Sequence, residues 1–166
     1  MKLKNIKSKS ELGDDKCNGY LIDADEKVAR SIIASLRDKK FVGVVAVLGR
    51  SGGFNRRVVE TLKIDYLISP ELGDRKDSLK QRDSGLNHVV AKEMAKRGVD
   101  VVFDFDSLAE MKGKLKAFRL ARIMQNVKVC RRAKCGIKIW GSVDKKALMS
   151  FGVGLGMSSV QVSKAC

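Results

Sequence analysis

The chain has 166 residues, with 34 Lys and Arg against 19 Asp and Glu, so its net charge is +15. The length suits one domain with a single core, and 44% apolar residues exclude a disordered basic tail. The longest nearly continuous apolar run, residues 41–49, is too short to cross a bilayer, and residues 1–10 lack the apolar segment of a secretory signal. The charge predicts a polyanionic partner, most simply nucleic acid, although an anionic membrane surface or a ribosomal role stays open on charge alone.

Most of the excess positive charge lies in one part of the chain. Residues 107–146 hold twelve basic and two acidic residues, a net charge of +10, whereas residues 1–20 carry a net charge of only +2. This asymmetry indicates a basic surface rather than a uniformly basic chain.

The N-terminal 18 residues are expected to be a flexible basic leader, because Lys and Ser alternate and Gly13-Asp14-Asp15 disfavours a helix. Residues 19–166 are then expected to form a single α/β barrel-like domain. Apolar runs predict strands at 20–22, 41–48, 65–68, 99–105 and 136–140. Helical spacing and capping residues predict helices from Asp23 or Asp25 to about 38, and at 55–63, 84–97, 112–129 and 144–151. The helix at 84–97 is expected to start on Asp83 or Ser84 and to end at Gly98.

This alternation of strands and helices predicts a parallel α/β fold, because the apolar strands are too continuous to be buried on one face only. A full eight-unit barrel normally needs about 200 residues or more. The chain can therefore supply only an incomplete or minimal barrel.

The predicted helix at 112–129 carries a candidate binding surface. Lys112, Lys116, Arg119 and Arg122 are spaced so that they share one face with Asn126, opposite a set of apolar residues. We call these four cations the predicted ridge. It could follow a row of phosphates, or it could be an ordinary solvated helix face.

The charged loop at 69–88 is a second candidate, because it follows a strand and enters a helix, which is the functional end of a parallel sheet. A helix starting near Ser84 would offer free N–H groups to a phosphate, with Arg82 and Asn87 beside it. The alternative is a capped loop in which Arg82 pairs with a neighbouring aspartate.

Catalytic and metal chemistry find little support in the sequence. His88 is the single histidine, which excludes a multi-His metal centre, and no nucleophile or orienting group is recognisable beside it. Cys130 and Cys135 are not spaced as zinc ligands, and without an export signal the four cysteines are expected to be reduced thiols. Trp140 could stack on a base or pack in the core. We therefore predict no catalytic residue, no metal site and no cofactor in this chain.

Several motifs in fixed order resemble one family. Asn55-Arg56, then residues 64–70, then the block Arg82-Asp83-Ser84-Gly85-Leu86-Asn87-His88 are similar to archaeal ribonuclease P protein component 3 and its eukaryotic nuclear counterparts. The block at 82–88 is the most specific part. The resemblance covers about residues 41–160.

The resemblance implies an α/β TIM-like barrel, shortened or incomplete at the N-terminus and distantly related to metal-dependent phosphoesterases. It implies a protein subunit of the ribonucleoprotein that removes 5′ leaders from precursor tRNA, in which the RNA performs the cleavage and Mg²⁺ serves the holoenzyme. The implied partners are ribonuclease P RNA, protein component 2 and the other protein subunits, with precursor tRNA contacted indirectly. The expected location is the cytoplasm, with no membrane partner.

The cationic and polar residues of these segments are the candidates for RNA contact. They are Arg82, Asn87, His88, Lys112, Lys116, Arg119, Arg122 and Lys138, followed by Arg56, Arg75 and Lys76. A metal phosphoesterase of the related barrel type needs a cluster of histidines and carboxylates, which a chain with one histidine lacks. Two alternatives stay open: a degenerate phosphoesterase-type barrel, and a general basic RNA-binding protein outside ribonuclease P.

Overall fold

Six parallel strands form one sheet in the sequential order β1-β2-β3-β4-β5-β6. The structure, a computed structural model, describes residues 3–13, 17–73, 77 and 82–166. The strands are β1 (Lys4–Ile6), β2 (Gly19–Ile22), β3 (Val44–Leu48), β4 (Tyr66–Ile68), β5 (Asp100–Asp104) and β6 (Ile137–Trp140). The helices are η1 (Lys9–Glu11), α1 (Glu26–Asp38), α2 (Gly52–Thr61), α3 (His88–Arg97), α4 (Phe105–Glu110), α5 (Gly113–Ala133), α6 (Lys145–Gly154) and α7 (Ser159–Ala165).

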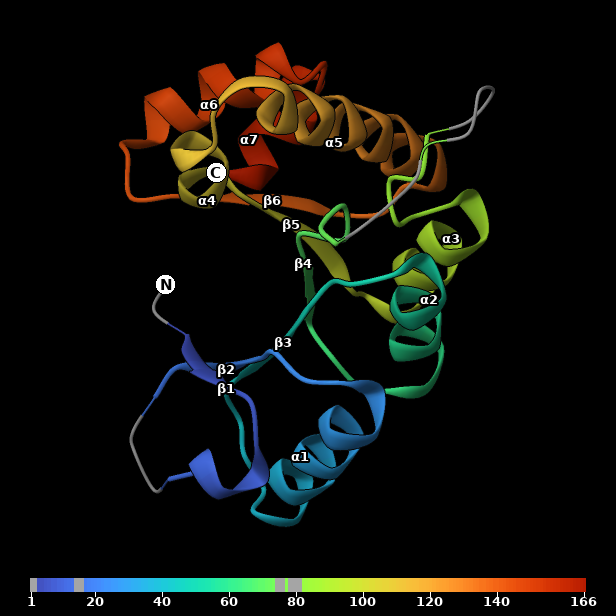
Figure 1. Cartoon of the computed structure of the whole chain (residues 1–166), viewed down its shortest axis with the longest axis vertical. Helices are drawn as coiled ribbons and strands as arrows, with labels where there is room; N and C mark the ends of the chain where they lie inside the picture. The colour runs from blue at the N-terminus through green and yellow to red at the C-terminus, as the bar shows by residue number, and fades with distance from the viewer. Residues whose placement is uncertain (1–2, 14–16, 74–76, 78–81) are drawn as a thin grey trace.

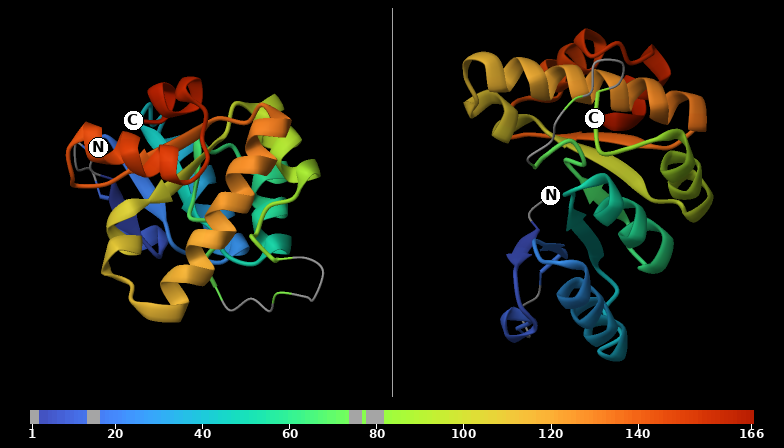
Figure 2. Two further views of the ribbon diagram at one scale, coloured as in Figure 1. Left: turned by 90° about the horizontal axis from the view of Figure 1, so that it is seen from above. Right: turned by 45° about the vertical axis from the view of Figure 1, so that its right-hand side comes forward.

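The sheet curves strongly, and the major helices lie along its convex side (Figure 1). β1 and β6 are the two edge strands, and they lie on opposite sides of an opening. Figure 2 shows α1, α2 and α3 following one another around the outside, with α5 crossing beyond them. The described residues therefore form an open sheet of the TIM-like α/β class, as the alternation of elements predicts.

The two faces of the sheet differ in what they bury. On the convex face, Val47, Leu67 and Phe103 are fully buried beneath the helices in the main core. The concave face has a smaller apolar cluster around Ala46 and Val102. Side chains alternate between the faces along each strand, so nearly continuous apolar runs serve both clusters.

The expectation of a flexible leader over residues 1–18 is wrong where the structure describes that segment. Lys4–Ile6 forms β1, which pairs in parallel with β2 through Ile6↔Ile22, and η1 follows. Ile6 is fully buried in the main core. A three-residue strand is too short to show a clear alternation of apolar and polar residues. The lysines around it gave this segment the composition of a flexible leader.

Helix boundaries follow the capping residues. Asp25 and Asp144 cap α1 and α6 as predicted, and Gly98 ends α3 with a positive φ of 70°. The predicted start of the third helix at Asp83 or Ser84 is wrong. Asn87 is its N-cap and accepts hydrogen bonds from the N–H groups of Val89 and Val90 at 3.0 and 2.9 Å.

The five predicted strands are confirmed, and the sequence reasoning missed the short helices α4 and α7. In the described ranges, no helix is long and apolar enough to cross a membrane.

Candidate nucleic-acid interface

Asn55 connects three segments at the carboxyl end of the sheet through hydrogen bonds of its side chain. Its side chain, on α2, is fully buried. The amide oxygen accepts a hydrogen bond from the Arg50 N–H at 2.8 Å, and the amide nitrogen donates to the carbonyl groups of Pro70 and Gly85, both at 3.1 Å. The loop after β3, the end of β4 and the loop before α3 are thus held together by one side chain. Asn55 therefore has a structural role at this end of the sheet.

Arg119 on α5 also connects several segments through its side chain. Its side chain is only 4% exposed and its Nε donates to Glu71 Oε1 at 3.0 Å. The two Nη atoms donate to Ser107 Oγ at 2.8 Å and to Ser69 Oγ at 3.1 Å. The guanidinium therefore joins the chain after β4, the short helix α4 and the long helix α5. A group with this burial and these partners cannot contact an external phosphate.

The predicted ridge is wrong as a surface, because α5 turns that face inward. Asn126 is fully buried and donates to the Ser84 carbonyl at 2.9 Å. Arg122 has a side chain that is 13% exposed and pairs with Asp77 at 3.2 Å. Lys116 is partly buried, and its Nζ donates to the Ala109 carbonyl at 3.2 Å. Of the four predicted cations, only Lys112 is exposed.

The helix turns this way because its bulkiest core residues share the inward face. Ile123, Val127 and Cys130 are all fully buried there. The sequence predicts a packing side made of Ala117, Leu120, Ala121, Met124 and Val127, but of these only Val127 is buried. Ile123 and Cys130 are the signal that could have set the helix phase correctly, because Ile and free Cys are among the most buried residue types.

Three exposed cations of α5 lie together on a different face. Lys114, Lys128 and Arg132 are exposed, and their spacing places them within about 40° of one another around the helix, at about 100° per residue. We call these three residues the outer stripe. The stretch from residue 111 to residue 143 contains no Asp or Glu, so no carboxylate of α5 neutralises them. Lys114 lies over the Phe118 ring at 5.5 Å.

At the start of α3, some of the predicted contact residues are exposed and others are used within the fold. His88 and Arg82 are exposed, and Arg82 makes a long ion pair of 3.8 Å with Asp77. Asn87 is exposed, but its side-chain oxygen already caps the helix. Arg75 and Lys76 lie outside the described residues.

The remaining candidates serve contacts within the chain. Arg56 is paired with Glu60 on the same helix at 2.7 Å. Lys138 lies on β6, and its Nζ donates to the Lys164 carbonyl at 2.6 Å. Burial raises the pKa of Asp100 on the neighbouring strand, and the charge of Lys138 partly opposes that rise.

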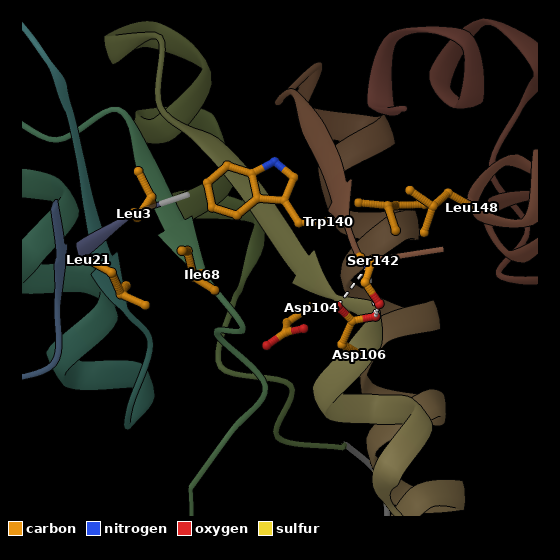
Figure 3. A pocket seen from close by; sticks show the side chains of 10 residues that line it. Leu3, Leu21, Ile68, Asp104, Asp106, Trp140, Ser142 and Leu148 are labelled. Carbon is orange, nitrogen blue, oxygen red and sulfur yellow. Dashed lines mark hydrogen bonds between the residues drawn. The ribbon is translucent and has the colours of Figure 1, made fainter. Parts of the chain in front are cut away.

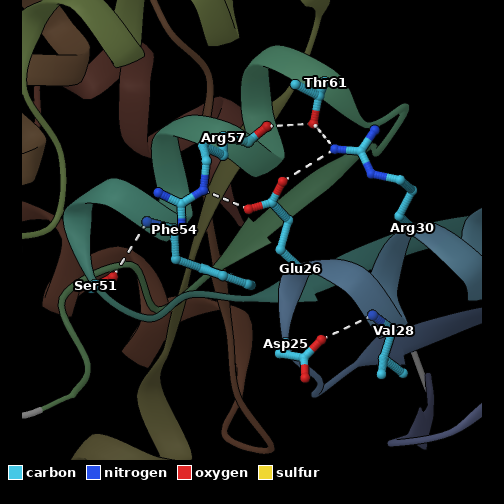
Figure 4. Close-up of polar contacts among 8 residues, drawn as sticks. All are labelled: Asp25, Glu26, Val28, Arg30, Ser51, Phe54, Arg57 and Thr61. Carbon is cyan, nitrogen blue, oxygen red and sulfur yellow. Dashed lines mark hydrogen bonds and ion pairs between the residues drawn. The ribbon is translucent and has the colours of Figure 1, made fainter.

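Cations near the N-terminal helices are neutralised locally. Figure 4 shows Glu26 on α1 receiving hydrogen bonds from Arg57 of α2 and from Arg30 of its own helix. The hydrogen bond from Arg57 is the largest cause that lowers the pKa of the Glu26 carboxyl. Two cations of this region thus have a carboxylate partner, whereas residues 107–146 carry a net charge of +10.

The concave face holds a pocket of about 650 Å³ between the carboxyl ends of the strands (Figure 3). Asp104 and Asp106 bring two carboxylates to it, and Asp106 accepts hydrogen bonds from the Ser142 N–H at 2.8 Å and from its Oγ at 3.1 Å. Trp140 lies beside them and makes an edge-on contact with Tyr66. Within the described ranges, no three His, Cys, Asp or Glu residues gather as a metal site. Negative carboxylates repel phosphates, so this pocket is not a candidate site for phosphate groups.

Sequence comparisons relate the chain to one group of proteins. No protein-family model matches it. Ribonuclease P protein component 3 of Methanococcoides burtonii is 30% identical over 112 residues, which are 68% of this chain and 42% of that protein. The component 3 protein of Methanocaldococcus jannaschii is 28% identical over 125 residues, 72% of this chain and 51% of that protein. That of Thermococcus gammatolerans is 27% identical over 134 residues, 76% of this chain and 59% of that protein. The chain spans about half the length of these curated relatives.

The fold comparison leads to the same group. A chain in a cryo-EM structure of archaeal ribonuclease P with mature tRNA superposes with a TM-score of 0.69 at 22% identity, over 90% of this chain and 65% of that chain. At this identity the likeness concerns the fold. The resemblance read from the sequence motifs is confirmed by the sequence matches, and the fold class by this superposition.

Proposed function

This chain is related in sequence and in fold to archaeal ribonuclease P protein component 3, and from that relationship we propose that it is a protein subunit of ribonuclease P. In this role it binds the RNA subunit and assists the removal of 5′ leaders from precursor tRNA. The observation that carries the proposal is the combination of these sequence matches with the outer stripe on a helix that has no carboxylate.

The outer stripe supplies what RNA binding requires. Most of the affinity of a basic protein for nucleic acid comes from cations that neutralise phosphates and release counterions. Lys114, Lys128 and Arg132 are exposed on a single helix face, and none has a carboxylate partner on that helix. His88 and Arg82 at the start of α3 are the second set of candidates, because they remain exposed beside fastened loops.

The chain itself is proposed to be non-catalytic. Hydrolysis by a related metal phosphoesterase would require several ligands around metal ions. The sequence has a single histidine, and the described residues contain no group of three or more potential ligands. We therefore assign cleavage, and the Mg²⁺ that supports it, to the RNA. The chain would work in the cytoplasm beside protein component 2 and the other protein subunits, with precursor tRNA contacted indirectly.

Reconstitution tests this role. Ribonuclease P RNA, component 2 and this chain are combined with precursor tRNA at limiting Mg²⁺. The expected result is faster 5′ cleavage than with the RNA and component 2 alone. No gain, with RNA binding intact, would contradict the proposal and favour a general basic RNA-binding protein.

A second assay separates the phosphoesterase alternative. The purified chain is incubated with phosphate esters and Mn²⁺, Mg²⁺ or Zn²⁺, and no product is expected. Metal-dependent turnover that disappears in His88→Ala would instead assign a degenerate phosphoesterase to this fold.

A further inference from the structure

An apolar groove runs along one side of α5, between that helix and its neighbours α4 and α6. Its volume is about 430 Å³, within the range of about 300–1,000 Å³ typical of binding clefts. α5 contributes Lys116, Leu120 and Met124, which are spaced by four residues and so extend along about 12 Å of the helix at 1.5 Å per residue. The groove is thus long enough to receive side chains from successive turns of another helix.

The lining of the groove is almost entirely apolar. Phe105 and Phe151 meet edge-on at 5.0 Å between their ring centroids, and Leu108 and Leu155 line the groove with them. Met124 at its border is 40% exposed. Phe105, Phe151 and Met124 leave apolar surface open to water here, and removing such surface from water favours association.

Positive charge lies along the α5 side of the groove. Lys116 lies in its wall, and Lys128 and Arg131 follow Met124 by four and seven residues on the same side of α5. Arg131 reaches the Gly156 carbonyl at 3.5 Å, directly after the groove residue Leu155. Residues 111–166 contain a single carboxylate residue, Asp144, so the walls formed by α5 and α6 have almost no negative charge. The carboxylates of the third wall, α4, are Asp106, which is hydrogen-bonded to Ser142, and Glu110 at the end of that helix.

We propose that this groove is the docking site of an amphipathic helix from a partner protein, with apolar residues on one face and Asp or Glu on its flanks. The apolar lining receives anchors spaced at i, i+4 and i+7, as in other helix-in-groove complexes. The cations on the α5 side pair with an acidic flank of the helix and select against basic helices. RNA is disfavoured as the occupant, because phosphates and ribose would desolvate poorly against phenylalanine and leucine. This inference rests on the chemistry of the groove and is independent of the ribonuclease P assignment.

A helical peptide display library, selected on the purified full-length chain, supplies the test. The expected enriched sequences have an apolar stripe flanked by Asp and Glu. Selection on Met124→Glu, which places a carboxylate at the groove border, should not enrich them. Val42→Glu is the matched control, because Val42 is 98% exposed in the segment between α1 and β3 and the change adds the same charge to an exposed apolar position.

The best enriched peptide is then synthesised and its binding is measured by fluorescence anisotropy. Met124→Glu is expected to weaken binding about tenfold or more, as anchor positions in interfaces do, and Val42→Glu to leave it unchanged. Circular dichroism establishes that both variants are folded. Enrichment of no helix, enrichment of basic helices, or equal binding to both variants would overturn the proposal. Two further results together would assign the groove to RNA and also overturn the proposal. A single-stranded RNA would displace the peptide, and Met124→Glu would weaken RNA binding as much as it weakens peptide binding.

Discussion

Arg119 on α5 and Glu71 after β4 form an ion pair of 3.0 Å whose side chains are 4% and 0% exposed. Forty-eight positions separate them in the chain. The pair holds the loop at the carboxyl end of the sheet against the long basic helix. A cation that the sequence offered as an RNA contact is therefore part of what positions the surface.

Removing one partner of this pair should be strongly destabilising. Arg119→Met leaves the Glu71 carboxylate buried without its guanidinium, a change that typically costs about 3–5 kcal/mol. Urea unfolding of the variant measures the loss. The double variant Arg119→Met with Glu71→Leu should recover much of it, because no isolated charge then remains. A loss below about 1 kcal/mol in the single variant would contradict the buried pair.

The outer stripe should govern the salt dependence of RNA binding. Replacing Lys114, Lys128 and Arg132 with Ala should flatten the plot of log K against log salt by about 0.7–0.9 for each phosphate that the variant no longer neutralises. The control is Arg30→Ala, because Arg30 is exposed but paired with Glu26. An unchanged slope in the triple variant, with the fold intact, would remove this stripe from the RNA interface.

Asn87 should matter for stability more than for RNA contact. Asn87→Ala removes the acceptor of two backbone N–H groups and should cost about 0.5–2 kcal/mol. Asn87→Asp preserves the cap and should keep most of that stability. Thermal unfolding of both variants makes the comparison. Equal stability of the wild type and the Ala variant would show that the cap contributes nothing.

Asp100 should make the stability of the fold depend on pH in an unusual direction for a carboxyl. Burial raises its pKa above 3.8, so the folded state favours the protonated form. The contribution of Asp100 to the free energy of unfolding is therefore fully present below pH 3.8. It is lost as the pH rises through the pKa of Asp100 in the folded state. Asp100→Asn should increase stability at pH 7 relative to the wild type, and the difference should vanish near pH 3. A variant less stable than the wild type at pH 7 would contradict the sign.

The sequence predicted the architecture better than the surface. The runs around Val47, Leu67 and Phe103 are apolar because each face of the sheet buries an apolar cluster, and this pattern is visible in the sequence. β1 escaped notice because three residues cannot display a period. Its burial depends on pairing with β2, which is a tertiary contact.

The sequence predicted which segments of the candidate site lie together, but not which of their side chains are buried and which are exposed. The motifs at Asn55 and at 82–88 do lie together at the end of the sheet, as their position after strands suggested. Spacing alone could not tell which face of α5 is inside, because a buried Arg119 with three partners looks in sequence like an exposed one. Composition identified the basic helix, and only packing identified its outward side.

Recovery of the complex from cells tests the central claim most directly. The chain is tagged in the cells that make it and purified under native conditions, and the bound RNA is sequenced while the eluate is assayed on precursor tRNA. The account predicts enrichment of ribonuclease P RNA together with 5′ leader cleavage that is sensitive to RNA digestion. An eluate with ribosomal or unrelated RNA and no leader cleavage would contradict it.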